Sequence, residues 1–338
     1  MNLINFRNFQ TLQTAGKLGL WLLISLALSL IFFQEFWASL GTMLSLDWIF
    51  GQHHASPWGV LALCLIWLYL KRKEVWREML ENRQVKRLQV GRLEGRGGER
   101  CEPYKPSNFM NLQTFKLALL GLALVVGAIL VPPSRDFLVF QVLLASLGVF
   151  VVVFGKAAKI PSILLGIYGF AISFPLIIER FGELPYSMSE IKPLMWILTS
   201  LGYSLESQGH WVHLISFSGE PISVAITAGC AGPATMGVFI AIFALMMLDT
   251  TLPPRKAVWL FLFGAVGTWF QSFIRLIILM LVGYHWGEDA MWTAHFWTIY
   301  ILFPLWYLLF AYIYFRQAGS LRRIRGEVSA QMRRTINA

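Results

Sequence analysis

Long apolar runs separated by short polar segments dominate the chain, and this pattern predicts membrane-spanning helices. A helix needs about 20 apolar residues to cross the hydrocarbon core of a bilayer. Backbone groups find no water there, so such segments are expected to be helical. The runs that meet this description are residues 18–40, 49–70, 115–131, 137–154, 160–178, 233–248, 257–282 and 295–315.

The segment between the fifth and sixth predicted spans has a different pattern. Residues 187–201 carry apolar side chains at helical spacing, which predicts a helix lying in the membrane interface. Residues 211–217 and 222–226 are strand-like and flank a Ser-Gly-Glu-Pro turn, which predicts a β-hairpin. The expected fold class is therefore all-α: a polytopic membrane protein of about eight transmembrane helices, with a short extracytoplasmic interfacial helix and hairpin cap.

Composition and charge support a membrane protein and give it an orientation. The chain is 57% hydrophobic and 14% charged, whereas a soluble domain carries about 25% charged residues. Basic residues gather in residues 71–116, in two short links near 156–159 and 255–256, and in residues 316–334. The positive-inside rule makes these segments cytoplasmic. We therefore expect a multi-pass protein of the plasma (inner) membrane with both termini in the cytoplasm. No compact basic domain is present, so nucleic-acid binding is not expected.

Three chemically suited side chains are predicted to share one depth in the membrane. Arg275 interrupts an apolar run, where a charge costs about 2.5–3.5 kcal/mol on insertion scales, and such residues are commonly functional. Cys230, Arg275 and His295 each lie about 20 residues from the cytoplasmic flank of their helix, which at 1.5 Å per residue is about 30 Å. His295 titrates near neutrality and could carry a proton at that level.

The surroundings of Cys230 favour a reactive thiol. Pro233 is suited to the first turn of a helix, which places Cys230 just before a helix N-terminus. The positive end of a helix stabilises a thiolate, and a neighbouring Arg275 would stabilise it further. The small residues Gly229 and Gly232 leave room for an extended peptide to approach the sulfur. The site is thus predicted at the extracytoplasmic face.

A metal site is the weaker interpretation of the same outer segment. His210 and His213, with Glu206 or Glu220 as a further ligand, could support metal-dependent hydrolysis. Two side chains three positions apart on a strand face opposite surfaces, however, which argues against shared coordination. No metal and no organic cofactor is expected.

The order of these motifs resembles the exosortase/archaeosortase family of membrane cysteine transpeptidases. The resemblance covers about residues 115–315. It is carried by residues 197–203 and 224–232, which lead to Cys230, by Arg275 in an apolar span and by His295 at the start of the next. Ala231 stands where the family commonly has a small hydroxyl residue, and Ser272, with Gln271 beside it, stands where many members have asparagine. The resemblance implies that Cys230, Arg275 and His295 are catalytic. We expect substrate to contact Gly229, Gly232, Gln271 and Ser272.

What the resemblance implies is an enzyme that processes exported proteins. Its substrates would end in a recognition motif, a hydrophobic helix and a basic tail, and would be transferred through a thioester to a lipid or another surface acceptor. Residues 1–114 would be an N-terminal extension with two helices and a basic loop, residues 115–316 the catalytic core, and residues 317–338 a basic cytoplasmic tail. The alternative is a non-enzymatic transporter or assembly subunit that binds an anion at Arg275.

Overall fold

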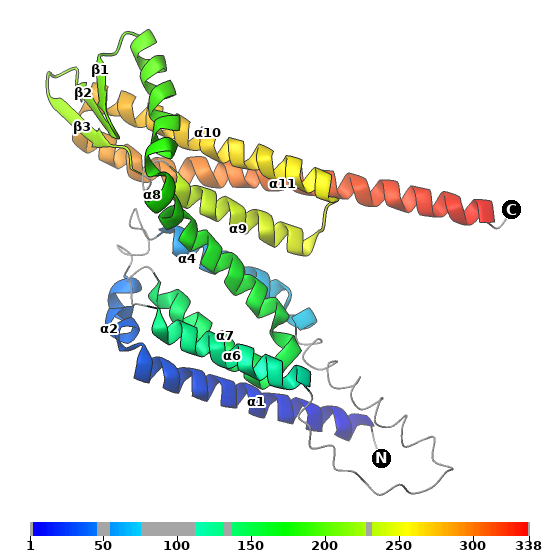
Figure 1. Cartoon of the computed structure of the whole chain (residues 1–338). Helices are drawn as coiled ribbons and strands as arrows, with labels where there is room; N and C mark the ends of the chain where they lie inside the picture. The colour runs from blue at the N-terminus through cyan, green and yellow to red at the C-terminus, as the bar shows by residue number, and fades with distance from the viewer. Residues whose placement is uncertain (1–2, 46–54, 76–111, 132–136, 228–231, 337–338) are drawn as a thin grey trace, which may run out of the picture. The chain divides into compact units, whose positions relative to one another are not determined.

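Residues 3–45, 55–75, 112–131, 137–227 and 232–336 are described by this computed structural model, whose elements are labelled in Figure 1. They form two compact units. The first comprises residues 1–51 and 64–169, and the second residues 52–63 and 170–338. The division therefore passes within two helices, α4 (Ala55–Leu70) and α8 (Lys159–Ser200).

The first unit is a group of apolar helices packed through small residues. Besides parts of α4 and α8 it contains α1 (Leu3–Phe32), α2 (Gln34–Met43), α6 (Leu112–Leu130), α7 (Leu138–Phe154) and the 3-10 helix η1 (Gly155–Ala158). Gly121 and Gly148 let α6 and α7 approach closely, because a Cβ on either would lie 2.6 Å from the other's carbonyl oxygen. Small residues serve this purpose where helices associate in membranes.

The structure divides the predicted span 18–40 into two helices. Phe33 has φ −120° and ψ 47°, which is not helical, and it separates the end of α1 from the start of α2. Its side chain is buried in a cluster with Ala128 and Ala145, so the break coincides with a tertiary contact. The predicted span 49–70 is described from residue 55 onward, where it forms α4; its first six positions lie outside the described residues.

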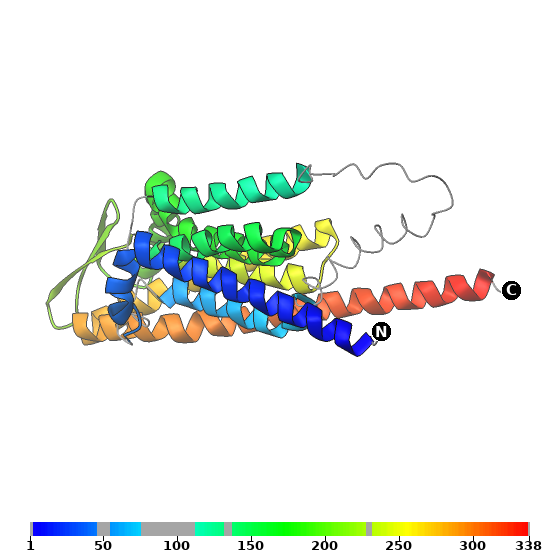
Figure 2. The ribbon, with the colours of Figure 1, turned by 90° about the horizontal axis from the view of Figure 1, so that it is seen from below.

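The second unit combines helices with a small antiparallel sheet. Its elements are the first part of α4, the later part of α8, strands β1 (Leu205–Gln208), β2 (Trp211–Ile215) and β3 (Pro221–Ala225), and helices α9 (Pro233–Asp249), α10 (Pro254–Trp286) and α11 (Glu288–Ile336). The strand order is β1-β2-β3, with Val212 opposite Val224 in the β2–β3 pair. Helix α11 runs as one rod to its red C-terminal end in both views (Figures 1 and 2).

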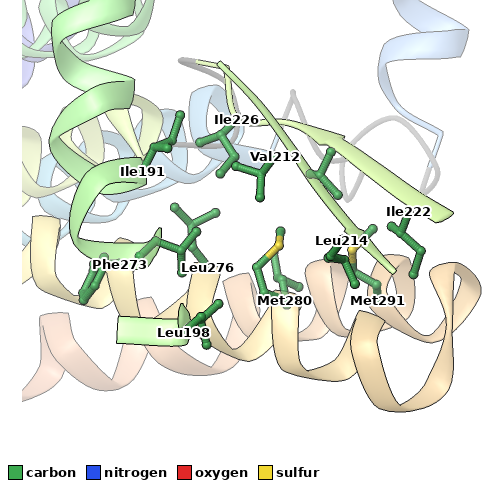
Figure 3. Packing of buried hydrophobic residues seen from close by; sticks show 13 residues of the cluster. Ile191, Leu198, Val212, Leu214, Ile222, Ile226, Phe273, Leu276, Met280 and Met291 are labelled. Atoms are coloured by element: carbon green, nitrogen blue, oxygen red, sulfur yellow. The ribbon is translucent and has the colours of Figure 1, made fainter. Parts of the chain in front are cut away.

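One face of the sheet is buried on α8 and α10. Val212, Ile222 and Ile226 are at most 2% exposed, and they belong to one apolar cluster with Ile191 of α8 and Leu276 of α10. Figure 3 shows these side chains pointing toward one another from the sheet and the helices. The alternating pattern of the strands therefore forms a cap with a buried inner face. This packing holds the sheet above the α10 segment that contains Arg275.

Three regions of the second unit differ from the predicted elements. Helix α8 consists of two helical pieces that meet at the non-helical residue Gly182, where φ is −147° and ψ 16°. The predicted helices 160–178 and 187–201 lie on its two sides, and the difference is that the pieces meet at a kink instead of being separated by a loop. A third strand, β1, was not predicted. Helix α11 begins at Glu288, two turns before His295, and continues to Ile336 through the predicted tail.

The composition of the helices supports a polytopic membrane protein. Among the described residues, four helical segments are long and apolar enough to cross a bilayer: Ala15–Phe32, Lys159–Ser200, Pro254–Trp286 and Glu288–Gly319. Four shorter apolar segments lie in α4, α6, α7 and α9. Large apolar side chains such as Leu23, Trp259 and Leu308 are more than 65% exposed, which suits contact with lipid rather than water. The number of eight spans stays a prediction.

Candidate active site

Arg275 and His295 form a buried hydrogen-bonded pair between α10 and α11. The arginine is 2% exposed and the histidine 5% exposed. Arg275 Nη2 lies 3.0 Å from Nδ1 and 2.9 Å from Nε2 of His295, and 3.5 Å from the histidine carbonyl oxygen. Both ring contacts are made by the same guanidinium nitrogen, which can only donate. Which ring nitrogen accepts depends on the tautomer of His295.

The hairpin of α10 and α11 places the two side chains together. The helices are antiparallel neighbours joined at Gly287, whose φ of 85° is in the left-handed region that glycine adopts readily. The backbone N–H of Gly287 donates to the Gly283 carbonyl at 3.0 Å and closes α10. The sequence placed Arg275 and His295 at one depth, and the structure shows that they are in contact. Their catalytic role stays a prediction.

Cys230 and Gly229 lie outside the described residues, and Gly232 marks the point where the described chain resumes. Gly232 has φ 86° and precedes Pro233 at the start of α9. A Cβ at Gly232 would lie 2.6 Å from Ser272 Oγ, so only glycine fits both this backbone conformation and this contact. Ser272 is one helical turn before Arg275, and side chains at this spacing share a helix face.

Hydrogen bonds hold the start of α9 in this position. Thr235 Oγ1 donates to the Gly232 carbonyl at 2.7 Å, and the N–H of Met236 donates to the same carbonyl at 2.9 Å. The Tyr307 hydroxyl of α11 donates to the Thr235 carbonyl at 2.7 Å. The start of α9 therefore lies close to α10 at Gly232 and is hydrogen-bonded to α11 through Thr235.

Residues of the cap that precede the undescribed segment 228–231 in the sequence also lie beside His295. Val224 and Ile226 line a small cavity together with Leu276, Leu279, Met291, Trp292 and His295. The ring of Trp292 meets that of His295 edge-on, with 5.4 Å between centroids. Ile226 is completely buried, and its N–H donates to the His210 carbonyl at 2.8 Å. Both flanks of residues 228–231 are thus fixed near the Arg275–His295 pair.

The two remaining predicted substrate contacts differ in burial. Ser272 is 1% exposed, and its hydroxyl has no hydrogen-bond partner among the described residues. Gln271 is half-buried, and as the preceding helical residue it points about 100° away from Ser272 around the axis. Ser272 therefore lies with Gly232 and Arg275, and Gln271 does not share that face.

Glu190 is a buried acid that is not among the site residues predicted from the sequence. It is fully buried on α8, and its carboxyl group faces the Ser272 hydroxyl and interacts electrostatically with Arg275. Among the described residues, neither carboxyl oxygen has a hydrogen-bond partner. A sequence signal did exist: Glu190 lies four and eight positions before Leu194 and Leu198, on the apolar stripe of the predicted interfacial helix. An acid on such a stripe is unusual enough to be a candidate.

The other candidate ligands and the buried cysteine have separate environments. His213 Nδ1 lies 2.8 Å from Ser223 Oγ across the sheet, and Glu206 is opposite His213 in the β1–β2 pair. Within the described ranges, no group of three or more His, Cys, Asp or Glu residues could hold a metal. Cys64, in the first unit, is buried with its sulfur 3.9 Å from the Leu164 carbonyl oxygen. It fills space between two helices.

Comparison of this chain with models of known protein families identifies one matching family. The family model for transmembrane exosortases (Exosortase_EpsH) matches residues 59–312, which is 254 of the 338 residues. No curated protein and no solved structure matches the chain. The matched region begins in α4 and includes the elements around Ser272, Arg275 and His295. The chain therefore belongs to the transmembrane exosortase family.

Proposed function

We propose that the chain is a membrane-embedded cysteine transpeptidase that cleaves the C-terminal sorting signals of exported proteins. The observation that carries this proposal is the buried Arg275–His295 pair, next to the packed start of α9 that follows Cys230. Burial of a cation has a desolvation cost of several kcal/mol, so a buried arginine beside an imidazole is expected to have a functional or structural role. The family is associated with the processing of sorting signals.

Cys230 is the proposed nucleophile because chain connectivity keeps it close to this pair. Consecutive Cα atoms are about 3.8 Å apart, so the Cα of Cys230 can lie no more than about 8 Å from that of Gly232. Gly232 contacts Ser272, one turn from Arg275. Cys64 is buried between helices of the first unit, so a substrate backbone has no access to it.

In the first half of the reaction, the Cys230 thiol gives its proton to the neutral ring of His295, and the thiolate attacks the scissile carbonyl carbon. Arg275 stabilises the thiolate and then the oxyanion of the tetrahedral intermediate. When the C–N bond breaks, the imidazolium of His295 protonates the departing amine. A thioester on Cys230 and a neutral histidine remain.

In the second half, an acceptor amine attacks the thioester. His295 takes the proton that the amine loses, the new amide forms, and Cys230 leaves as a thiolate that Arg275 stabilises. The proposed acceptor is a lipid headgroup or another surface amine, so the exported protein becomes anchored. Water in place of the amine would give simple proteolysis. The sequence of steps requires no metal or organic cofactor.

The proposed substrates end in a short motif, an apolar helix and a basic tail. Such a helix could lie against the apolar surface of the enzyme, with the tail held in the cytoplasm by the positive-inside rule. The scissile bond would then lie near the outer boundary of the hydrocarbon core. Arg275 and His295 are expected at that level, because each lies about 20 residues from the cytoplasmic flank of its helix. The protein would reside in the plasma or inner membrane, with both termini in the cytoplasm.

Mass spectrometry of a processed substrate tests this function. An exported protein with such a C-terminus would be produced in cells that contain the wild-type enzyme or none, and its intact mass measured. We expect a product that lacks the apolar helix and carries the added mass of an acceptor, only when the enzyme is present. An unchanged C-terminus would contradict the proposed activity, and a shortened product without added mass would contradict the transfer step.

A further inference from the structure

A small cavity beside His295 has no role in the reaction described above. Its volume is about 10 Å³, which is the room for one water-sized group. Three parts of the chain contribute its walls: the end of β3 with the residue that follows it, helix α10, and the first turns of α11. Since His295 is one of the lining residues, a group held in the cavity would lie next to the proposed proton carrier.

The walls of the cavity belong to the packed core under the cap. The lining residues Val224, Ile226, Leu276, Leu279 and Met291 are members of one buried apolar cluster, and each is at most 8% exposed. Figure 3 shows Ile226, Leu276 and Met291 within this cluster. Side chains in such a core interdigitate closely and keep defined rotamers. The cavity is therefore expected to keep its shape when a ligand enters.

Trp292 marks the place where the cavity reaches the surface. In the described part of the chain it is the one lining residue with substantial exposure, 41%, whereas His295 is 5% exposed. The indole N–H donates to Glu288 Oε1 at 3.2 Å, and the indole ring meets the His295 ring edge-on. The indole thus borders both the accessible surface and His295. The entrance to the cavity therefore lies beside Trp292.

The chemistry of the walls selects an apolar group. Apart from the ring of His295, the lining side chains are aliphatic groups, a thioether and an indole, and the indole N–H already donates to Glu288. A charged or polar group in the cavity would lose its contacts with water without gaining hydrogen bonds. An apolar group would gain dispersion contacts with walls that have no partner atoms on that side. The small volume favours a side chain of the size of alanine.

We propose that this cavity is a substrate subsite that takes the side chain of a small apolar residue of the sorting motif, next to the cleaved bond. Consecutive Cα atoms are about 3.8 Å apart, so a residue whose side chain lies beside His295 has its own peptide bonds close to the imidazole. The subsite aligns the scissile bond with the proton carrier, and such alignment is a large part of enzymatic rate enhancement. The inference deepens the proposed function and rests on it.

Two variants that change the cavity by one methylene group in opposite directions test the subsite. Val224→Ile fills the cavity, and Ile226→Val enlarges it. The probe is a substrate whose cut has been located by intact mass, with the residue on each side of the cut replaced in turn by glycine, alanine, valine, leucine or aspartate. At one of these two positions the wild-type enzyme should favour alanine over glycine, leucine and aspartate by about 10-fold or more in kcat/KM, because one methylene group in an apolar pocket is worth about 10- to 200-fold.

The two variants should shift this preference in opposite directions. We expect Val224→Ile to favour glycine at that position and Ile226→Val to favour valine, each with a change of about 10-fold in kcat/KM relative to the alanine substrate. Val266→Ile makes the same exchange at a position on α10 that is 64% exposed, and it should leave the ratios unchanged. These ratios are insensitive to a general loss of folded enzyme, because such a loss lowers the rate for all substrates equally.

Either of two results would overturn the subsite. One is a wild-type enzyme that processes the leucine or aspartate substrates as well as the alanine substrate at both positions. The other is an order of preference that is the same in both cavity variants as in the wild type. Failure of the proposed function would look different: no substrate of the series, including the parent sequence, would be processed, and the subsite would fall with it.

Discussion

Replacement of Cys230 by alanine is expected to abolish processing, with a loss of at least about 10⁴-fold in rate. The thioester cannot form without the sulfur, and removal of the nucleophile from a hydrolase with covalent catalysis has effects of about 10⁶-fold. Conversion of a substrate with a C-terminal sorting signal, followed by gel shift or intact mass, measures the effect. Cys230→Ser should retain at most a trace, because a hydroxyl is far less acidic than a thiol.

Two matched replacements make this result specific. Cys64→Ala removes a buried thiol that packs on the Leu164 carbonyl, and Cys101→Ala removes a thiol from the basic loop. Both should process substrate at close to the wild-type rate. A silent Cys230→Ala combined with a harmful Arg275→Ala would instead support the non-enzymatic alternative, in which Arg275 binds an anion.

The second large effect is expected for Arg275→Lys, with a loss of about 10²–10³ in turnover. That is the usual cost of removing one donor that stabilises an oxyanion. Lysine keeps the charge but offers a compact ammonium in place of a planar fork of donors, so it cannot contact His295 and the reacting groups together. Turnover with saturating substrate is the measurement. Arg255→Lys, at an exposed position at the start of the same helix, should be nearly silent. Almost full activity in the Arg275→Lys enzyme would show that a point charge is sufficient.

The helix boundaries were predictable where an apolar run and a residue typical of a helix end mark the same position. Pro233 and the apolar run after it predicted the start of α9 at the observed residue, and the apolar runs of α6 and α7 were predicted within a few residues. These boundaries depend on local sequence alone. Prediction failed where packing decides the outcome, as at Phe33, whose buried ring accompanies the break between α1 and α2.

The missed elements have similar physical explanations. Strand β1 contains three polar residues and one leucine, so it has no alternating pattern, and it exists because it pairs with β2. Helix α11 begins seven residues before the predicted span 295–315, because Glu288 and Asp289 are acidic residues that favour the first turn of a helix. In α8 the two predicted helices are present on either side of Gly182, and only their direct junction was not predicted. Pro185 lies in the first turn of the second piece, a position that proline suits.

The sequence predicted that Arg275 and His295 lie at the same level on neighbouring helices, but not that their side chains point toward each other. Counting residues from the cytoplasmic flanks placed Arg275 and His295 at one level, because helical rise is constant. Contact also requires the right rotation of α10 and α11 about their axes, and that follows from their packing. Glu190 could not be assigned to the site from the sequence, because it lies on a third helix, α8, whose packing beside α10 the sequence does not give. Its neighbours on the apolar stripe were recognised, but its partner across the interface could not be.

The most direct measurement is the identification of the acyl-enzyme. Enzyme would be mixed with a substrate peptide in the absence of acceptor amines and quenched in acid, and its cysteine-containing peptides analysed by mass spectrometry. The account predicts a substrate fragment on Cys230 that neutral hydroxylamine removes, as expected of a thioester. The same adduct on Cys101, or continued processing with no adduct on any cysteine, would contradict it.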